Sequence, residues 1–290
     1  MAAGDLITQD WEAEFRGLLM GPDTAYEIQG IEGLLSLPDV SSSDQGRLRR
    51  HGQRAGDDFL QGRTVTITLE VFGADTQAFA LAIDRLDQAL RPCVTEEPLV
   101  FRIPTVALGA KIQVGARVRR SDIPVDTVFF YNRQTITVEF DCTDPRRYSN
   151  TVNTASSSLP SDTGGLTFDA DPDFSFGLAT SGGGLSAPNA GSFPTPVTFR
   201  IDGPVTSPNI VNNATGARLH LKGLTLLTGQ WIILDSESRT VLLNGTADRY
   251  FYLTSDSTWW DLEPGSNSMS YAASASTTST LAATWRSAWV

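Results

Sequence analysis

The residue types that most often do chemistry in proteins are scarce in this chain. It has two histidines, His51 and His220, and two cysteines, Cys93 and Cys142. His51 lies in a polar stretch, and His220 alternates with leucines, which is typical of a strand residue facing solvent. The cysteines are not spaced as metal ligands or as a disulfide framework, so we interpret them as small buried hydrophobes. We therefore predict no catalytic, metal or cofactor residue and no bound cofactor.

Acidic residues offer two weaker possibilities. Asp169, Asp171 and Asp173 are spaced two apart, as in some calcium-binding loops. Such a loop also needs a glycine at its sixth position and a glutamate at its twelfth, where this chain has Phe174 and Thr180. A solvated acidic linker is the better interpretation. Pairs of carboxylates elsewhere keep a cell-wall glycosidase as an enzymatic alternative.

Four arginines gather in one short polar segment and are candidates for a subunit contact: Arg47, Arg49, Arg50 and Arg54. The surrounding stretch from Ser41 to Gly62 has no apolar period, which predicts a long exposed loop. Guanidinium groups can bind phosphates or an acidic partner surface. Two aspartates follow directly, however, and most loop charges are simply solvated.

Tryptophans concentrate near the C-terminal end, at positions 231, 259, 260, 285 and 289. Burial is the usual fate of such rings. Aromatic side chains exposed on a β-sandwich can instead stack on sugars. Trp259 and Trp260 are the candidates for a glycan platform in this alternative, which makes the chain a carbohydrate-binding module for adsorption to a host surface.

Composition narrows the class of protein further. The chain has 290 residues and a net charge of −11, which opposes the basic footprint of sequence-specific nucleic-acid binders. The length corresponds to about two folded domains, and the hydrophobic fraction of 40% is close to that of ordinary globular proteins. No apolar run reaches the length of a membrane helix, and the start does not resemble a signal peptide. We expect a protein made without a secretion signal and with no membrane partner.

The first half reads as mainly β with one helix. Alternating apolar residues predict strands at 63–71 and 135–141, and shorter strands are expected at 99–103 and 111–119. Residues 13–20 favour a strand that leads into a turn. Asp75 is a plausible N-cap for a helix from Thr76 to Leu90, whose face carries Phe79, Ile83 and Leu86.

The second half begins with a change of composition. Residues 151–195 are rich in Ser, Gly and Pro, which predicts a linker between a domain at 1–150 and a domain at 196–290. Short strands bounded by turn residues then follow at intervals of about ten residues, which is typical of a β-sandwich. Asn244-Gly245 is a strong turn signal among them.

Several segments, in this order and spacing, also match a known family. In the first half they are Gly62-Arg63 before VTITLEVFG, the following helix, Pro98-Leu-Val-Phe-Arg102, and Asp144-Pro-Arg-Arg-Tyr148. In the second half they are 208–213 with Thr215-Gly216, then 228–235, 239–245 and 260–267. The chain resembles the distal tail protein family of long-tailed, non-contractile phages, the siphovirus tail components.

The resemblance implies a fold and a structural function. The expected fold is mainly β: a tail-tube-like β-barrel or sandwich with one α-helix, followed by a galectin-like β-sandwich. The expected protein is not an enzyme but a homohexameric ring at the tail tip of a virion, assembled in the host cytoplasm. Its expected partners are the tail tube protein and the tape-measure and tail-tip or baseplate hub proteins. DNA would pass through an acidic, weakly adhesive lumen without specific binding.

Overall fold

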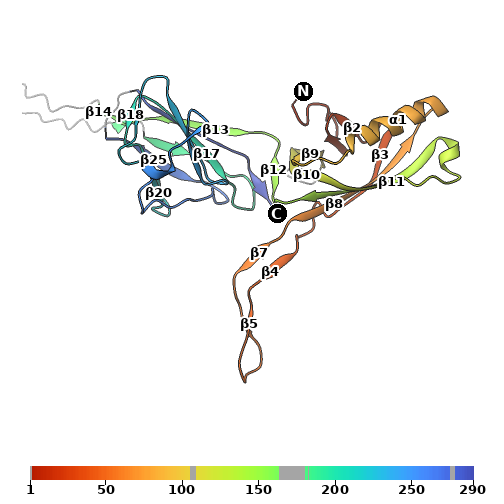
Figure 1. Ribbon diagram of the computed structural model, residues 1–290, viewed down its shortest axis with the longest axis horizontal. Coiled ribbons are helices and arrows are strands. Elements are labelled where there is room, and N and C mark those ends of the chain that lie inside the picture. Colours follow the sequence, from red (N-terminus) through yellow and green to blue (C-terminus); the bar gives the residue numbers. More distant parts are fainter. Residues whose placement is uncertain (1, 105–108, 163–179, 182, 275–277) are drawn as a thin grey trace, which may run out of the picture. The chain divides into compact units, whose positions relative to one another are not determined.

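The computed structural model describes residues 2–104, 109–162, 180–181, 183–274 and 278–290. These residues divide into two compact units, one of residues 1–151 with 289–290 and one of residues 152–288. Figure 1 shows both units as β-rich, with the helix and a long hairpin in the first. Within the described residues, no helix is long and apolar enough to cross a membrane.

The first unit is built on one antiparallel sheet. Its strands follow the order β2 (Leu18–Met20), β1 (Glu12–Phe15), β9 (Glu97–Arg102), β10 (Lys111–Asp122), β11 (Arg133–Cys142), β8 (Arg63–Phe72) and β3 (Tyr26–Glu32). β12 (Arg147–Ser149) pairs with β10, and β27 (Ala288–Trp289) with β12. Among the described strands, β2 and β3 are the two ends and do not pair. The sheet is therefore open among the described strands, so of the two expected forms, a barrel or a sandwich, no closed barrel is formed.

Strict alternation explains the long strands. β8 and β11 are paired along ten residues each, from Arg63↔Cys142 to Phe72↔Arg133. Val65, Ile67 and Leu69 of β8 are fully buried, while the residues between them face the other side. The mainly β class and these strands are confirmed.

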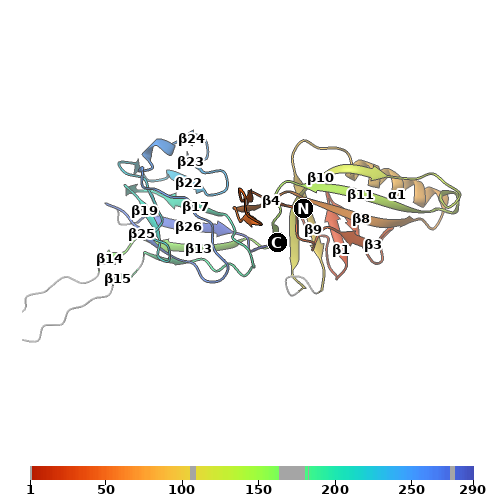
Figure 2. The same ribbon diagram turned by 90° about the horizontal axis from the view of Figure 1, so that it is seen from below.

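Helix α1 (Thr76–Ala89) lies against one face of this sheet, behind the strands in the view of Figure 2. The Asp75 side chain accepts a hydrogen bond from the backbone N of Ala78 at 2.7 Å, so the predicted N-cap is present. Phe79 and Leu86 are buried against the sheet, and Tyr26 Oη donates to the carbonyl of Ala82 at 2.9 Å.

Residues 13–20 form a hairpin instead of one strand. β1 pairs with β2 from Ala13↔Met20 to Phe15↔Leu18. Arg16 and Gly17 lie between them with φ of 50° and 75°, the left-handed conformation that a two-residue hairpin turn requires. The alternation of apolar and polar residues did not predict the turn at Arg16 and Gly17, because arginine is an unusual residue in a two-residue hairpin turn.

Residues 33–62, which we call the arm, form a hairpin and not the predicted loop. β4 (Val40–Ser42) pairs with β7 (Asp58–Leu60), and β5 (Gln45–Gly46) pairs with β6 (Gln53–Arg54). Figure 1 shows the arm extending away from the sheet of its own unit. The sequence carries no apolar period over residues 41–59 because neither face of the hairpin packs on a core there.

The second unit is a β-sandwich. One sheet has the order β13 (Asn153–Ser158), β26 (Thr280–Trp285), β17 (Val197–Asp202), β22 (Trp231–Asp235), β23 (Thr240–Leu243) and β24 (Ala247–Asp248). The other has the order β16 (Gly184–Ser186), β25 (Ser268–Ala272), β19 (Asn209–Asn212) and β20 (Arg218–His220). Two short ladders join β18 (Val205–Thr206) to β21 (Thr225–Leu226) and β14 (Ser161–Asp162) to β15 (Thr180–Ser181). Aliphatic and aromatic residues of both sheets form the buried core.

Part of the predicted linker belongs to this sandwich. β13 pairs with β26 over six residues, from Asn153↔Trp285 to Ser158↔Thr280. The small polar side chains of β13 do not alternate with apolar ones, so the sequence pattern does not predict a strand. Backbone hydrogen bonds, and not side-chain burial, hold β13 at the edge of the sheet. The candidate calcium-like residues Asp169, Asp171 and Asp173 lie outside the described residues.

Candidate functional site

Most of the arm does not pack on the core of the first unit. All residues from 41 to 59 are exposed, and each of its two ladders contains only two or three residue pairs. A two-stranded hairpin without a packed face is only marginally stable in water. The arm is therefore suited to folding against a partner rather than to supporting its own unit.

Local hydrogen bonds give the arm its hairpin shape. The backbone N of Arg47 donates to the carbonyl of Gly52 at 3.2 Å, and Arg49 and Gly52 have φ of 57° and 92° at the reversal. Further along, Ser43 Oγ donates to the carbonyl of Asp57 at 3.0 Å. Gly56 must be a glycine because a Cβ would collide with the carbonyl of Ser43.

Arg63 anchors the root of the arm through hydrogen bonds to backbone carbonyls. Its side chain is 2% exposed, and its Nη1 donates to the carbonyls of Gly33 at 2.8 Å, of Leu34, and of Ser36 at 3.3 Å. Its Nε donates to the carbonyl of Pro145 at 2.9 Å. The guanidinium of Arg63 thus connects the segment in which the arm leaves the sheet to β8, the strand in which the chain returns to the sheet.

Among the described residues no carboxylate forms an ion pair with Arg63, although Asp144 lies near enough to act on its charge, and backbone carbonyls accept its hydrogen bonds. Burial, followed by the neighbouring Arg147, lowers the pKa of Arg63 below its ordinary value. Burial also lowers the pKa of Arg147. Sequence reasoning missed Arg63, although its position in phase with Val65 and Ile67 places it on the inward face of the strand.

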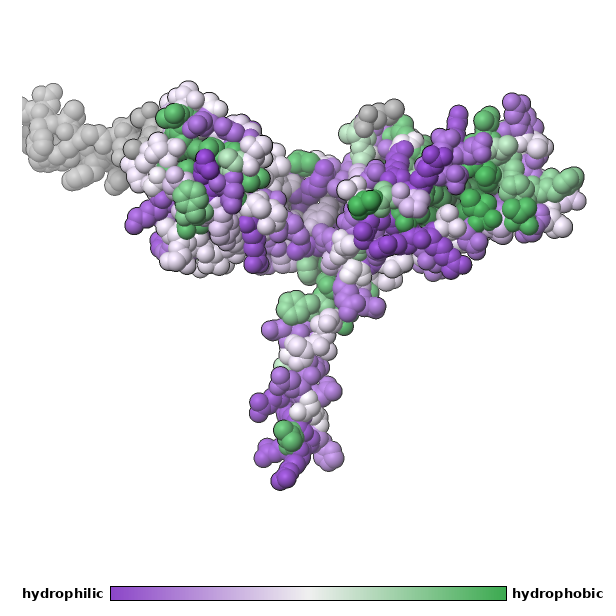
Figure 3. All heavy atoms as spheres, in the orientation of Figure 1, coloured by the Kyte–Doolittle hydropathy of each residue, from purple (hydrophilic) through white to green (hydrophobic). Residues whose placement is uncertain are grey.

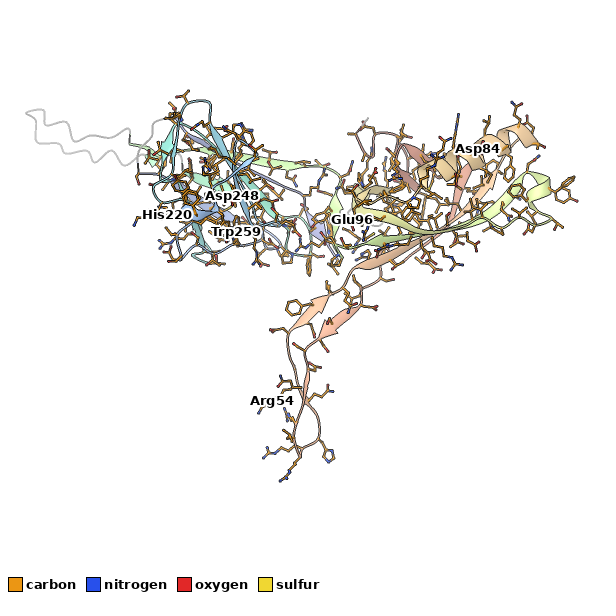
Figure 4. All side chains as sticks on the ribbon, in the orientation of Figure 1. Arg54, Asp84, Glu96, His220, Asp248 and Trp259 are labelled. Atoms are coloured by element: carbon orange, nitrogen blue, oxygen red, sulfur yellow. The ribbon has the colours of Figure 1, made fainter. Side chains whose placement is uncertain are left out.

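The predicted arginine cluster lies at the far end of the arm. Residues 45–54, which we call the arm tip, contain four arginines, one histidine and no carboxylate: Arg47, Arg49, Arg50, His51 and Arg54. Figure 4 shows Arg54 on the arm, away from the sheet. Within the part of the chain that the structure describes, none of these arginines forms an ion pair.

Apolar side chains are exposed at the root and at the tip of the arm. Leu35, Leu37 and Phe59 are exposed near the root, and Leu48 at the tip is 92% exposed. Figure 3 shows that the rest of the arm surface is mostly hydrophilic. Large apolar groups in water on a protruding hairpin are typical of an interaction surface.

The predicted tryptophan platform lies in a different environment. Trp259 and Trp260 are half-buried and pack against the core of the second unit. The ring of Trp260 lies 5.8 Å from that of Phe199, with 53° between their planes. The core therefore covers part of both side chains, which reduces the surface that they could offer to a sugar.

The remaining candidates for chemistry are not brought together. The residues that the structure describes contain no group of three or more His, Cys, Asp or Glu side chains that could hold a metal ion. Burial, Arg218 and Lys222 lower the pKa of His220, so this histidine is mainly neutral at pH 7. Cys142 is buried, and burial raises its thiol pKa to about 12, which makes it a poor nucleophile.

Comparison with known proteins identifies the class of the C-terminal region. Residues 190–289 match the family model described as the siphovirus-type tail component, C-terminal domain. This region is therefore a phage tail component domain, a structural and not an enzymatic class. The predicted resemblance is confirmed for this region.

One solved structure has a similar fold over nearly the whole chain. The structure described as SPP1 Dit, a paradigm of the hub adsorption apparatus in phages that infect Gram-positive bacteria, is similar with a TM-score of 0.67 and 15% identity. The likeness covers 96% of this chain and 99% of that one. Chains of the phage P2 baseplate in its activated conformation with Ca and with Sr give TM-scores of 0.49 and 0.45 at 9% and 11% identity, covering 90% of this chain and 91% of theirs. No curated protein matches the sequence.

Proposed function

We propose that the protein is the distal tail hub of a long-tailed phage. In this function six copies form a ring that joins the last ring of the tail tube to the tape-measure and tail-tip or baseplate proteins. The family match of residues 190–289 supports a tail component. The fold shared with a hub adsorption protein over 96% of the chain supports a hub in particular.

The exposed arm is the observation that most supports assembly. A ring forms from heterologous contacts, in which one surface of a copy binds a different surface of the next. An arm with unpaired arginines and exposed apolar side chains suits the first of these surfaces. The ring would let DNA pass through its lumen, and the net charge of −11 favours weak adhesion to DNA. The protein would be part of the virion tail tip after assembly in the host cytoplasm.

Removal of the arm tests this function. The backbone N of Gln61 donates to the carbonyl of Asp39 at 2.8 Å, so residues 40–60 can be replaced by a two-residue Asn-Gly turn without separating the strands. The full chain is expected to give multimers by light scattering, and the shortened chain monomers with unchanged circular dichroism. Multimers of the same mass from both chains would contradict an assembly role for the arm.

A further inference from the structure

A pocket at the turn between β1 and β2 contains a buried carboxylate that forms no ion pair among the described residues. The pocket has a volume of about 470 Å³, and the charged residues of its lining are Glu14, Arg16 and Glu97. Glu14 lies on β1 and is only 4% exposed. A buried charge is costly unless it is paired and hydrogen-bonded. Glu14 is therefore a candidate for binding a group from outside its own chain.

The hydrogen bonds of Glu14 leave much of its acceptor capacity unused. Its Oε2 accepts one bond, from the backbone N of Leu6 at 3.0 Å. A carboxylate has about four acceptor sites. Its Oε1 has no hydrogen-bond partner in the part of the chain that the structure describes and is not fully enclosed by protein. This oxygen is open to the pocket.

The other two charged residues of the lining compensate each other. Nη2 of Arg16 lies 2.9 Å from Oε1 of Glu97. Nη1 of Arg16 donates to the carbonyls of Arg91 at 2.8 Å and of Ala89 at 3.4 Å. Arg16 is thus bound by its own neighbours, and two carboxylates with one guanidinium leave one negative charge in the lining. That charge belongs to Glu14.

The chemistry of the pocket favours a cationic hydrogen-bond donor. A metal ion is disfavoured, because the described residues contain no group of three or more side chains that could hold one. A guanidinium group suits a single carboxylate better, since its planar fork of N–H donors can bind both carboxylate oxygens. Guanidinium is also more weakly hydrated than an ammonium group, which favours arginine over lysine in a buried pair.

The arm tip supplies arginines that lack such a partner. It contains four arginines and no carboxylate, and none of the four forms an ion pair among the described residues. Figure 1 shows the arm leaving the sheet of the first unit on the side opposite to the N-terminal segment, whose Ala3 and Leu6 border the pocket. The arm thus points away from the pocket of its own chain, so the occupant must come from a neighbouring molecule.

We propose that an arginine of the arm tip of one copy enters this pocket of a second copy and pairs with Glu14. This inference rests on the proposed ring and names the two surfaces of its heterologous contact. Acidic groups on the open surface also attract the arm tip, but exposed ion pairs contribute little. Loss of one partner from a desolvated pair weakens an interface much more.

Glu14→Gln tests the pocket. The amide keeps the shape of the side chain and an acceptor for the Leu6 N–H but removes the charge. The dissociation constant of the multimer should rise at least tenfold, because a desolvated charge pair is lost. At concentrations where the chains are single, the urea midpoint should stay the same or rise, because an unpaired buried charge is removed.

Glu12→Gln is the matched control. Glu12 lies on the same strand and is 3% exposed, but it does not line the pocket. Its Oε2 accepts hydrogen bonds from the backbone N of Thr8 at 2.6 Å and of Gln9 at 2.8 Å. Because bonds to a charged acceptor are the stronger ones, this substitution should lower the urea midpoint and leave the dissociation constant unchanged.

Double-mutant cycles then connect the pocket to the arm tip. Glu14→Gln is combined in turn with one substitution at the tip: Arg47→Gln, Arg49→Gln, Arg50→Gln or Arg54→Gln. For the arginine that occupies the pocket, the double variant should bind no more weakly than Glu14→Gln alone. For the other three arginines, the two effects should multiply.

The outcomes separate this contact from the proposed function. Multimers whose dissociation constant is unchanged by Glu14→Gln, or effects that multiply for all four arginines, would overturn the contact while the hub stands. A single-chain mass for the unmodified protein would overturn the proposed hub and this contact together.

Discussion

At the scale of single residues, one buried arginine determines where the arm leaves the sheet. Arg63 donates to carbonyls on both sides of the arm root, including those of Gly33 and Pro145. Arg63→Met keeps the length of the side chain but leaves these carbonyls without a donor. We expect the free energy of unfolding to fall by about 2 kcal/mol, measured by urea denaturation, and faster amide exchange at residues 33–39.

Arg133→Met is the matched control for this prediction. Arg133 lies in the same sheet, but its side chain is 58% exposed and pairs with Glu70 at 2.8 Å on the surface. Its loss should cost no more than about 1 kcal/mol and leave exchange in the arm root unchanged. Equal effects of the two substitutions would contradict the anchoring role of Arg63.

Substitution of Trp260 distinguishes a core role of the C-terminal tryptophans from a sugar-binding role. Trp260→Ala removes a ring that packs against Phe199. The free energy of unfolding should fall by about 3 kcal/mol, with no change in glycan-array binding, because none is expected from the intact protein. Specific glycan binding that disappears without loss of stability would favour the carbohydrate-binding alternative instead.

Two buried groups predict a loss of stability at alkaline pH. Burial raises the pKa of Cys142 from 9.0 to about 12 and the pKa of Tyr271 from 10.0 to about 12. A raised folded-state pKa means that the folded protein holds the proton more tightly than the unfolded chain. The contribution is therefore complete below pH 9 and is lost as the pH rises from 9 toward 12. Urea midpoints across this range should fall, and Cys142→Ala should reduce the part of the slope that begins near pH 9.

At the scale of elements, helix α1 depends on a cap that the sequence predicts. Asp75→Ala removes the acceptor of the Ala78 backbone N–H and should lower the free energy of unfolding by about 1 kcal/mol. Asp87→Ala, near the other end of the same helix, should leave it unchanged or raise it slightly, because it removes a negative charge near the C-terminal dipole. Thermal denaturation of the two variants checks the opposite signs.

The elements that were predicted from the sequence are those whose own residues carry the pattern of a strand or a helix. β8 and β11 alternate over their full length, and α1 begins at a capping residue. β13 and the arm have no such pattern. β13 is held by backbone hydrogen bonds to β26, which lies far along the chain. The exposed part of the arm does not pack on a core. The role of Arg63 was missed for a similar reason, since its acceptors are backbone carbonyls 30 and 82 residues away.

At the scale of the whole molecule, the proposed hub rests on two observations. The arm tip has four arginines that form no ion pair among the described residues, and the arm exposes Leu37, Leu48 and Phe59 to solvent. Residues 190–289 match a phage tail component domain.

Electron microscopy of the purified full-length chain is the most direct test of the hub. The proposed function predicts closed rings with six-fold symmetry and an open channel, with a mass six times that of the 31.3 kDa chain. Single chains at every concentration, or assemblies that do not close around a channel, would contradict it.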